Sequence, residues 1–339
     1  MSLPRGSDFT PPALLRNAHV QTMLSSSSLR RLFLRKRMAL VRKTAEPVHF
    51  TLTDGVRLEG AVTRQRVREM PRGLAVVYHG WEGSIDSSYV LQTGASLLEA
   101  GWDVFRLNFR DHGDTHHLNA GLFHSCLIDE VVEATTEAVA RLRPGQAPVA
   151  LAGFSLGGNF ALRVALRAPR IGLPLACTVA VCPVIDPHAG LHALETAPWI
   201  YEWYFMHKWR GSLKRKQRLF PAHDYFGRED LGQGLRGMTR SLVERHTDFG
   251  TLDAYLDGYA VSGARLSALA VPTTILTSED DPVIPVREFR ELDLPDCVEL
   301  DIAPRGGHCS FIDNWWLRSF TDDYITARFN AAVEPRAGN

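Results

Sequence analysis

The stretch that most constrains the fold of this chain is residues 149–159, which read VALAGFSLGGN. An apolar run leads into the pattern G-x-S-x-G at Gly153, Ser155 and Gly157, and the following residues have helical spacing up to Pro169, where we expect the helix to end. In this pattern a sharp strand-to-helix turn exposes the serine hydroxyl above the sheet, and side chains at the two glycines would collide with neighbouring backbone. The alternative is a glycine-rich corner in which the serine only caps the helix.

Short apolar runs alternate with segments of helical periodicity on both sides of this turn. We expect strands at residues 74–78, 103–107, 149–152, 175–181, 273–277 and 298–302. Helices are expected at residues 86–100, 128–142, 156–168, 286–292 and 315–329. This alternation predicts an α/β fold whose central sheet is mostly parallel, with helices on both faces and functional groups at the C-terminal ends of the strands. Residues 48–52 and 56–62 flank Asp54-Gly55, which predicts a two-residue antiparallel hairpin at the sheet edge.

One interruption of the alternation is too long to be a simple connection. The segment from Asp186 to Val271 is rich in aromatic residues, and we interpret it as a helical lid over the strand ends. Its aromatic side chains could line an acyl pocket or pack the lid on the core. The predicted organisation is therefore an N-terminal arm with a basic helix, a first core part, a lid insertion and a second core part, at residues 1–45, 46–186, 187–271 and 272–332.

Composition excludes several classes of protein. The formal net charge is zero, so no global electrostatic argument favours a nucleic-acid partner. Five cysteines without C-x-x-C spacing disfavour a disulfide framework and a zinc site, and suit a reducing cytoplasm. The first residues have no apolar run of signal-peptide length, and no apolar segment approaches the ~20 residues that span a bilayer. We expect a soluble cytoplasmic protein.

Residues 29–43 carry seven lysines and arginines and no acidic residue. We favour a basic, solvated helix that covers one end of the domain, because Lys36 and Arg37 interrupt its apolar stripe. The alternative is weak contact with an anionic membrane surface through this segment.

A serine hydroxyl needs a neighbouring base to act as a nucleophile, usually a histidine oriented by a carboxylate. After a strand-turn-helix serine the expected chain order is acid, then histidine. Asp281 follows a late strand at the expected position, with Asp280 as the alternative acid. Among 13 histidines, only His308 lies directly after the last expected strand. We therefore predict Ser155, Asp281 and His308 as a catalytic triad.

The negative charge that develops on an attacked carbonyl oxygen needs two N–H donors. We expect these from the backbone amides of Leu156, which follows the serine, and Trp81, in the loop after residues 74–78. We expect His79 to support that loop and the pair Arg110-Asp111 to tie loops together by ion pairing.

Four further histidines follow another expected strand, and a metal site is conceivable there: His112, His116, His117 and His124. Because they lack both metalloprotease spacing and cysteine partners, we interpret them as loop residues.

Together these motifs resemble the α/β-hydrolase superfamily. The motif HGW at residues 79–81, FRDHG at 109–113, GFSLG at 153–157, DDP at 280–282 and GH at 307–308 carry the resemblance. The segment NAHVQT at residues 17–22 is similar to the arm of the YheT-like hydrolases. The resemblance implies an α/β-hydrolase fold and an esterase acting on short- to medium-chain esters.

We therefore predict a serine esterase that cleaves small-molecule carboxylic esters through an acyl-enzyme on Ser155, with no cofactor and no metal. The alternatives are an alcohol O-acyltransferase that uses the same triad and a non-catalytic binding protein with this fold.

Overall fold

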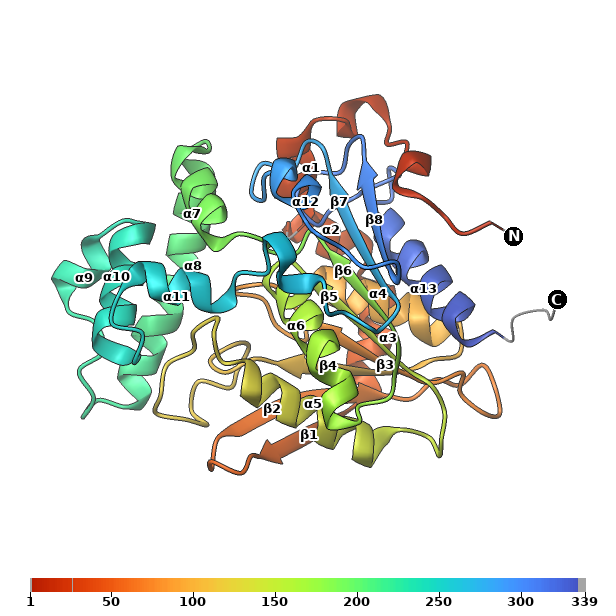
Figure 1. Cartoon of the computed structure of the whole chain (residues 1–339), viewed down its shortest axis with the longest axis horizontal. Coiled ribbons are helices and arrows are strands. Elements are labelled where there is room, and N and C mark those ends of the chain that lie inside the picture. The colour runs from red at the N-terminus through yellow and green to blue at the C-terminus, as the bar shows by residue number, and fades with distance from the viewer. Residues whose placement is uncertain (1, 26, 335–339) are drawn as a thin grey trace.

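The strands of this protein form one eight-stranded sheet in the order β1-β2-β4-β3-β5-β6-β7-β8 within residues 2–25 and 27–334, which the computed structural model describes (Figure 1). The first two strands and the β2–β4 pair are antiparallel, and every other pair is parallel. This confirms the predicted mostly parallel sheet with an antiparallel hairpin at its edge. The strands are β1 (Ala45–Thr51), β2 (Arg57–Thr63), β3 (Leu74–Tyr78), β4 (Asp103–Asn108), β5 (Val149–Phe154), β6 (Leu175–Val181), β7 (Thr273–Ser278) and β8 (Val298–Ala303).

Helices cover both faces of the sheet, and the central strand β3 shows why its sequence is apolar throughout. Helices α5 (Ile128–Leu142) and α6 (Leu156–Ile171) lie on one face (Figure 1). Leu74, Val76 and Tyr78 share a buried core with them. Successive side chains of a strand point to opposite faces, so burial of both faces requires an apolar residue at every position.

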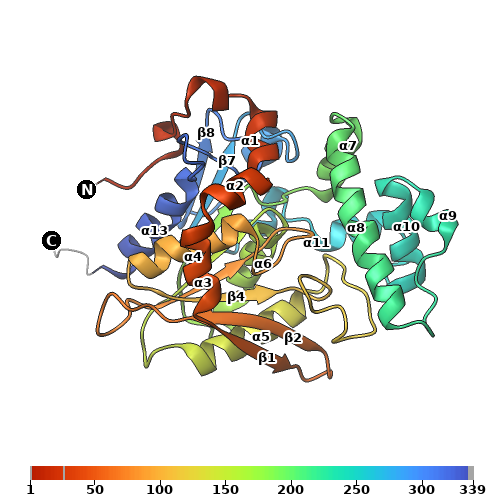
Figure 2. The same ribbon diagram turned by 180° about the vertical axis from the view of Figure 1, so that it is seen from behind.

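The other face of β3 presents Ala75 and Val77. These residues belong to a second buried core, built with α3 (Arg35–Lys43), α4 (Ser88–Glu99) and α13 (Phe320–Val333) (Figure 2). The N-terminal segment therefore contributes a helix to the layer on this face.

The edge hairpin differs from the two-residue loop that the sequence predicted. Residues 53–55 lie between Leu52 and Val56. The amide of Leu52 donates to the carbonyl of Val56 at 2.7 Å. Gly55 has φ 84°, and its amide donates to the carbonyl of Leu52. This is a three-residue loop with glycine in the left-handed position, a common alternative for the same sequence signal.

Two predicted helices have a boundary that differs from the structure by three residues or more. Helix α6 continues past Pro169 to Ile171, because this proline lies in the last turn and removes only one intrahelical N–H; Gly172 then caps the helix end. Helix α13 begins at Phe320 because the preceding residues form a turn in which the Asn314 side chain accepts the amide of Trp316 at 3.0 Å.

The segment between β6 and β7 forms a group of helices beside the strand ends (Figures 1 and 2). It has its own buried core, which includes Met206, Trp209, Met238 and Tyr255. Its elements are α7 (Pro187–Thr196), α8 (Ile200–Leu219), α9 (Arg228–Gly232), α10 (Leu235–His246), α11 (Leu252–Tyr259) and a 3-10 helix (Gly263–Leu266).

Helix α12 (Val286–Arg290) follows β7.

The N-terminal segment packs on the sheet core as short helices. Its elements are 3-10 helices at Gly6–Asp8 and Ala13–Leu15, then α1 (Ala18–Ser25), α2 (Ser28–Phe33) and α3. The basic run is thus two helices rather than one, and it is not solvated throughout. Arg30 is fully buried and donates to the carbonyls of Leu317 and Ser25. None of the helices in the described ranges has both the length and the hydrophobicity needed to cross a membrane.

Candidate active site

Ser155 occupies a strained turn between β5 and α6. Its φ and ψ are 53° and −119°, and its amide donates to the carbonyl of Val181 at 2.9 Å. A Cβ atom on Gly153 would lie 2.1 Å from the Gly157 carbonyl oxygen, and a Cβ on Gly157 would lie 2.3 Å from that of His79. The predicted steric need for glycine at both positions is confirmed.

The structure brings the three residues of the predicted triad together. His308 Nε2 lies 2.9 Å from Ser155 Oγ, and His308 Nδ1 lies 2.9 Å from Asp281 Oδ2. The other oxygen of Asp281 accepts the amides of Val283 and Ile284 at 2.8 and 3.0 Å. An ionised carboxylate only accepts hydrogen bonds, so the proton of the neutral ring sits on Nδ1 and the Nε2 lone pair faces the serine hydroxyl.

The neighbouring carboxylate of Asp280 has a different partner. Its Oδ1 accepts the backbone amide of Gly307 at 2.9 Å. Asp280 therefore anchors the loop that carries His308, whereas Asp281 contacts the imidazole itself.

The pKa of His308 is set by opposing effects. Burial is the largest and favours the neutral ring, but the Asp281 carboxylate and the neighbouring Cys309 side chain together hold the pKa of His308 well above its usual value. A ring with a raised pKa accepts a proton readily.

The loop after β3 is held by His79, as expected. This side chain is fully buried, with Nδ1 donating to the Gly80 carbonyl at 2.8 Å and Nε2 accepting the Phe109 amide at 3.2 Å. Burial lowers the pKa of His79 to about 4, so the ring is neutral at pH 7. The ring is a support for the loop.

Two backbone amides near Ser155 have no acceptor among the residues that the structure describes. Leu156 is the first residue of α6, where an N–H has no intrahelical partner. The amide of Trp81 makes no hydrogen bond to another described residue. This loop passes close to the serine, since a Cβ on Gly80 would lie 3.3 Å from the Cβ of Ser155, and Tyr89 Oη accepts the Gly80 amide at 2.8 Å.

The residues after β4 form ion pairs, as predicted. Arg110 pairs with Glu130, and Asp111 pairs with Lys216 of α8 at 2.5 Å. The second pair is buried, so it joins the loop to the helical insertion.

Among the described residues, the four histidines at 112, 116, 117 and 124 do not form a group of three potential metal ligands.

The N-terminal arm contributes residues to the site that the sequence reasoning missed. The Thr22 hydroxyl donates to the Ala18 carbonyl at 2.8 Å and accepts the His308 amide at 2.9 Å. The fully buried Gln21 side chain makes hydrogen bonds to both the N–H and the C=O of Ile312. The only signal in the sequence was the polar segment at residues 17–22, and the loop residues that Gln21 and Thr22 contact lie 291 and 286 positions away.

His19 of the arm contacts a different part of the molecule. Its Nδ1 lies 2.8 Å from the hydroxyl of Tyr201 in α8. The arm therefore contacts the helical insertion as well as the loop of His308.

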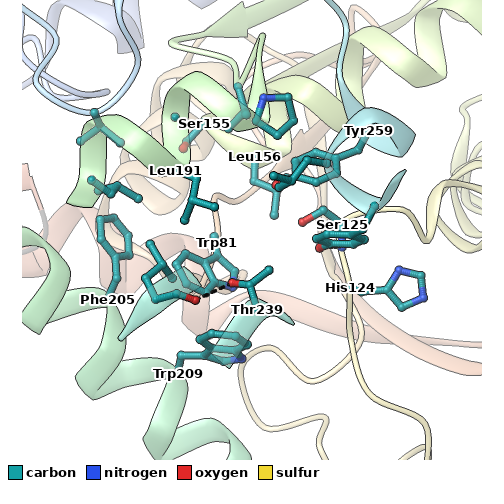
Figure 3. A pocket seen from close by; sticks show the side chains of 18 of the residues that line it. Trp81, His124, Ser125, Ser155, Leu156, Leu191, Phe205, Trp209, Thr239 and Tyr259 are labelled. Atoms are coloured by element: carbon teal, nitrogen blue, oxygen red, sulfur yellow. Dashed lines mark hydrogen bonds between the residues drawn. The ribbon is translucent and has the colours of Figure 1, made fainter. Parts of the chain in front are cut away.

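Two cavities meet at Ser155, and Trp81 and Phe205 line both of them. The rings of Trp81 and Phe205 stack with centroids 5.5 Å apart. The first cavity, of about 130 Å³, is largely apolar and includes Leu156, Leu191 and Trp209 (Figure 3). The second, of about 330 Å³, is more polar and includes Thr22, Ser87, Tyr201, Tyr204, Lys208 and His308.

The fold and the serine–histidine–aspartate arrangement define an α/β hydrolase. Within that class, the chain belongs to the hydrolase family described as serine aminopeptidase, S33, whose model matches residues 69–313. Two relatives match most of the chain. "Putative esterase YheT" of Escherichia coli is 28% identical over 340 residues, covering 96% of this chain and 95% of the relative. "Putative esterase slr0264" of Synechocystis is 25% identical over 348 residues, covering 93% and 90%.

Solved structures share the fold at low sequence identity. The Pyrococcus furiosus esterase Pf2001 has a TM-score of 0.53 and 16% identity, covering 85% of this chain and 91% of the esterase. A 2,6-dihydroxy-pseudo-oxynicotine hydrolase has a TM-score of 0.55 and 17% identity, covering 91% and 78%.

Proposed function

We propose that this protein hydrolyses carboxylic esters of short- to medium-chain acids through an acyl-enzyme on Ser155. The observation that carries the proposal is the 2.9 Å contact from His308 Nε2 to Ser155 Oγ, at the point where the two cavities meet. The esterase names of the two curated relatives support it.

In the proposed reaction His308 takes the hydroxyl proton while Ser155 Oγ attacks the ester carbonyl. The carbonyl oxygen becomes negative and accepts hydrogen bonds from the amides of Leu156 and Trp81. The tetrahedral intermediate expels the alkoxide, which receives the proton from His308. Water then attacks the acyl-enzyme with His308 again as base, and the carboxylic acid leaves.

The apolar cavity limits the acyl group. An apolar protein cavity of about 150 Å³ holds a benzene molecule, so the cavity of about 130 Å³ fits an acyl chain of about six carbons. The second cavity receives the alcohol, since its lining is more polar. Because α8 supplies Phe205 and Trp209 to the walls, the helical insertion serves as the lid.

The same linings favour an ester over a peptide with a free N-terminus. An aminopeptidase has to bind the α-ammonium group of its substrate, and a carboxylate is the natural partner for a desolvated cation. Among the described residues, neither cavity is lined by Asp or Glu, and the second contains Lys208.

The test is the turnover of p-nitrophenyl esters by Ser155→Ala. We expect at least a ~10³-fold loss of kcat, because the nucleophile is removed, with an unchanged circular dichroism spectrum. Ser125→Ala is the matched control, since Ser125 lines the same cavity and its replacement leaves the nucleophile intact. A fluorophosphonate probe should label wild type and the control but not Ser155→Ala. Near-normal turnover by Ser155→Ala would overturn the proposal.

A further inference from the structure

Two cysteines lie beside the imidazole nitrogen that faces Ser155. Cys309 Sγ is 3.8 Å from His308 Nε2, and the Cys309 amide donates to Cys182 Sγ at 3.4 Å. The two sulfur atoms and a ring nitrogen of His308 all lie within 4.8 Å of one another. Cys182 follows β6 and Cys309 follows β8, so the sheet brings together two thiols that are 127 positions apart.

The backbone holds both thiols in place. Cys182 and Cys309 have φ values of 43° and 58°, a conformation that residues with a Cβ rarely adopt. They are 0% and 6% exposed, and neither forms a disulfide. Cys309 and His308 nevertheless line the second cavity, which gives a small cation a route to the group.

We propose that Cys182, Cys309 and His308 form a binding site for a thiophilic divalent cation such as Zn²⁺, and that its occupation switches the enzyme off. Two thiolates and an imidazole are ligands that zinc prefers. With Zn–S and Zn–N bonds of about 2.3 and 2.0 Å, tetrahedral ligand atoms lie ~3.5–3.8 Å apart. The distance from Cys309 Sγ to His308 Nε2 already has this value, and the other pairs need to close by about 1 Å at most. Ser155 Oγ or a water molecule would complete the tetrahedron.

Inhibition follows because the metal binds through the Nε2 lone pair of His308. This part of the proposal rests on the proposed function. Asp281 keeps the ring proton on Nδ1, so Nε2 is free to bind the metal without a ring flip. The two thiols release their protons to solvent as they bind. The metal then occupies the lone pair that would otherwise accept the proton of Ser155, so the serine is no longer activated.

The binding test does not depend on turnover. Reduced, metal-free protein is titrated with Co²⁺, which takes the place of Zn²⁺ and reports thiolate ligands by a near-ultraviolet charge-transfer absorption. We expect one equivalent to bind to wild type and to Ser155→Ala, and Zn²⁺ to displace it. If Ser155→Ala binds Co²⁺ while wild type shows no esterase activity, the metal site stands and the proposed function fails.

The inhibition test measures fluorophosphonate labelling and ester turnover against Zn²⁺ concentration. Zn²⁺ should slow both in wild type, and EDTA should restore them. Cys182→Ser and Cys309→Ser should each raise the half-inhibitory concentration at least ~100-fold, since even loss of an outer contact can cost a metal site that much. Cys177→Ser is the matched control, because this buried cysteine of β6 lies outside the group.

Absence of the thiolate band in wild type would overturn the proposal. So would equal Zn²⁺ sensitivity of wild type and both variants. If Cys182→Ser does not fold, Cys309→Ser and the wild-type cobalt spectrum decide the question.

Discussion

The hydroxyl of Thr22 accepts the backbone amide of His308 at 2.9 Å, so the N-terminal arm holds the loop that positions the imidazole. The same hydroxyl donates to the carbonyl of Ala18, which fixes its orientation. The contact joins residues 286 positions apart and lies directly behind the proposed general base. It makes Thr22 a positioning residue for His308.

Thr22→Val keeps the side-chain shape and removes this acceptor. We expect kcat for p-nitrophenyl butyrate to fall roughly 5–10-fold, the equivalent of about 1 kcal/mol. KM should stay unchanged, because valine keeps the shape that Thr22 contributes to the second cavity and the acyl cavity is intact. Thr22→Ser should restore kcat. A loss of thermal stability with unchanged kcat would show that the contact is only structural.

The two adjacent carboxylates should behave differently. Asp281→Asn should lower kcat by ~10⁴-fold, because an amide no longer stabilises the imidazolium or selects the Nδ1–H tautomer. Asp280→Asn should lower it less than ~10-fold, since its amide oxygen still accepts the Gly307 amide. Steady-state kinetics on the two variants measures the contrast, and similar losses in both would contradict this assignment.

The pH profile should report the raised pKa of His308. The His308 imidazole must be neutral to act as a base. kcat/KM is therefore at its maximum above the pKa of His308 and falls as the pH drops through that value. Because Asp281, with Cys309, raises the pKa of His308 despite its burial, the acidic limb should lie above the ordinary histidine pKa of ~6.5. Residual activity of Asp281→Asn should show this limb at lower pH. His79, with its pKa lowered to about 4, adds nothing in this range. A wild-type limb at or below pH 6.5 would be inconsistent with the ion pair.

Acyl-chain preference should respond to Thr239. This residue of α10 lines the apolar cavity on the side away from Ser155 (Figure 3). Thr239→Trp should fill the far part of the cavity and lower kcat/KM for hexanoate esters ~10–100-fold, at about 0.8 kcal/mol for each displaced methylene, while acetate esters are spared. Thr239→Val, of similar size, should keep the wild-type profile. Equal effects on acetate and hexanoate would mean that the acyl chain lies elsewhere.

Much of the fold could be predicted because the signals are local. The helix at residues 128–142 and the strand at 175–181 match the structure residue for residue, since hydrophobic periodicity belongs to the segment itself. The predicted helix boundaries were wrong where a single capping or turn contact decides them, as at Gly172 and Asn314.

The sequence by itself determined the order of the core strands and helices along the chain and the strained serine turn. It also determined the loops on which an acid and a histidine would lie. Only the tertiary structure decided that Asp281 rather than Asp280 contacts the imidazole, that Thr22 supports His308, and that Cys182 meets Cys309. The physical reason is that periodicity and turn chemistry act over a few residues. A hydrogen bond between distant residues depends instead on where the packed sheet places two backbones, to within about an ångström.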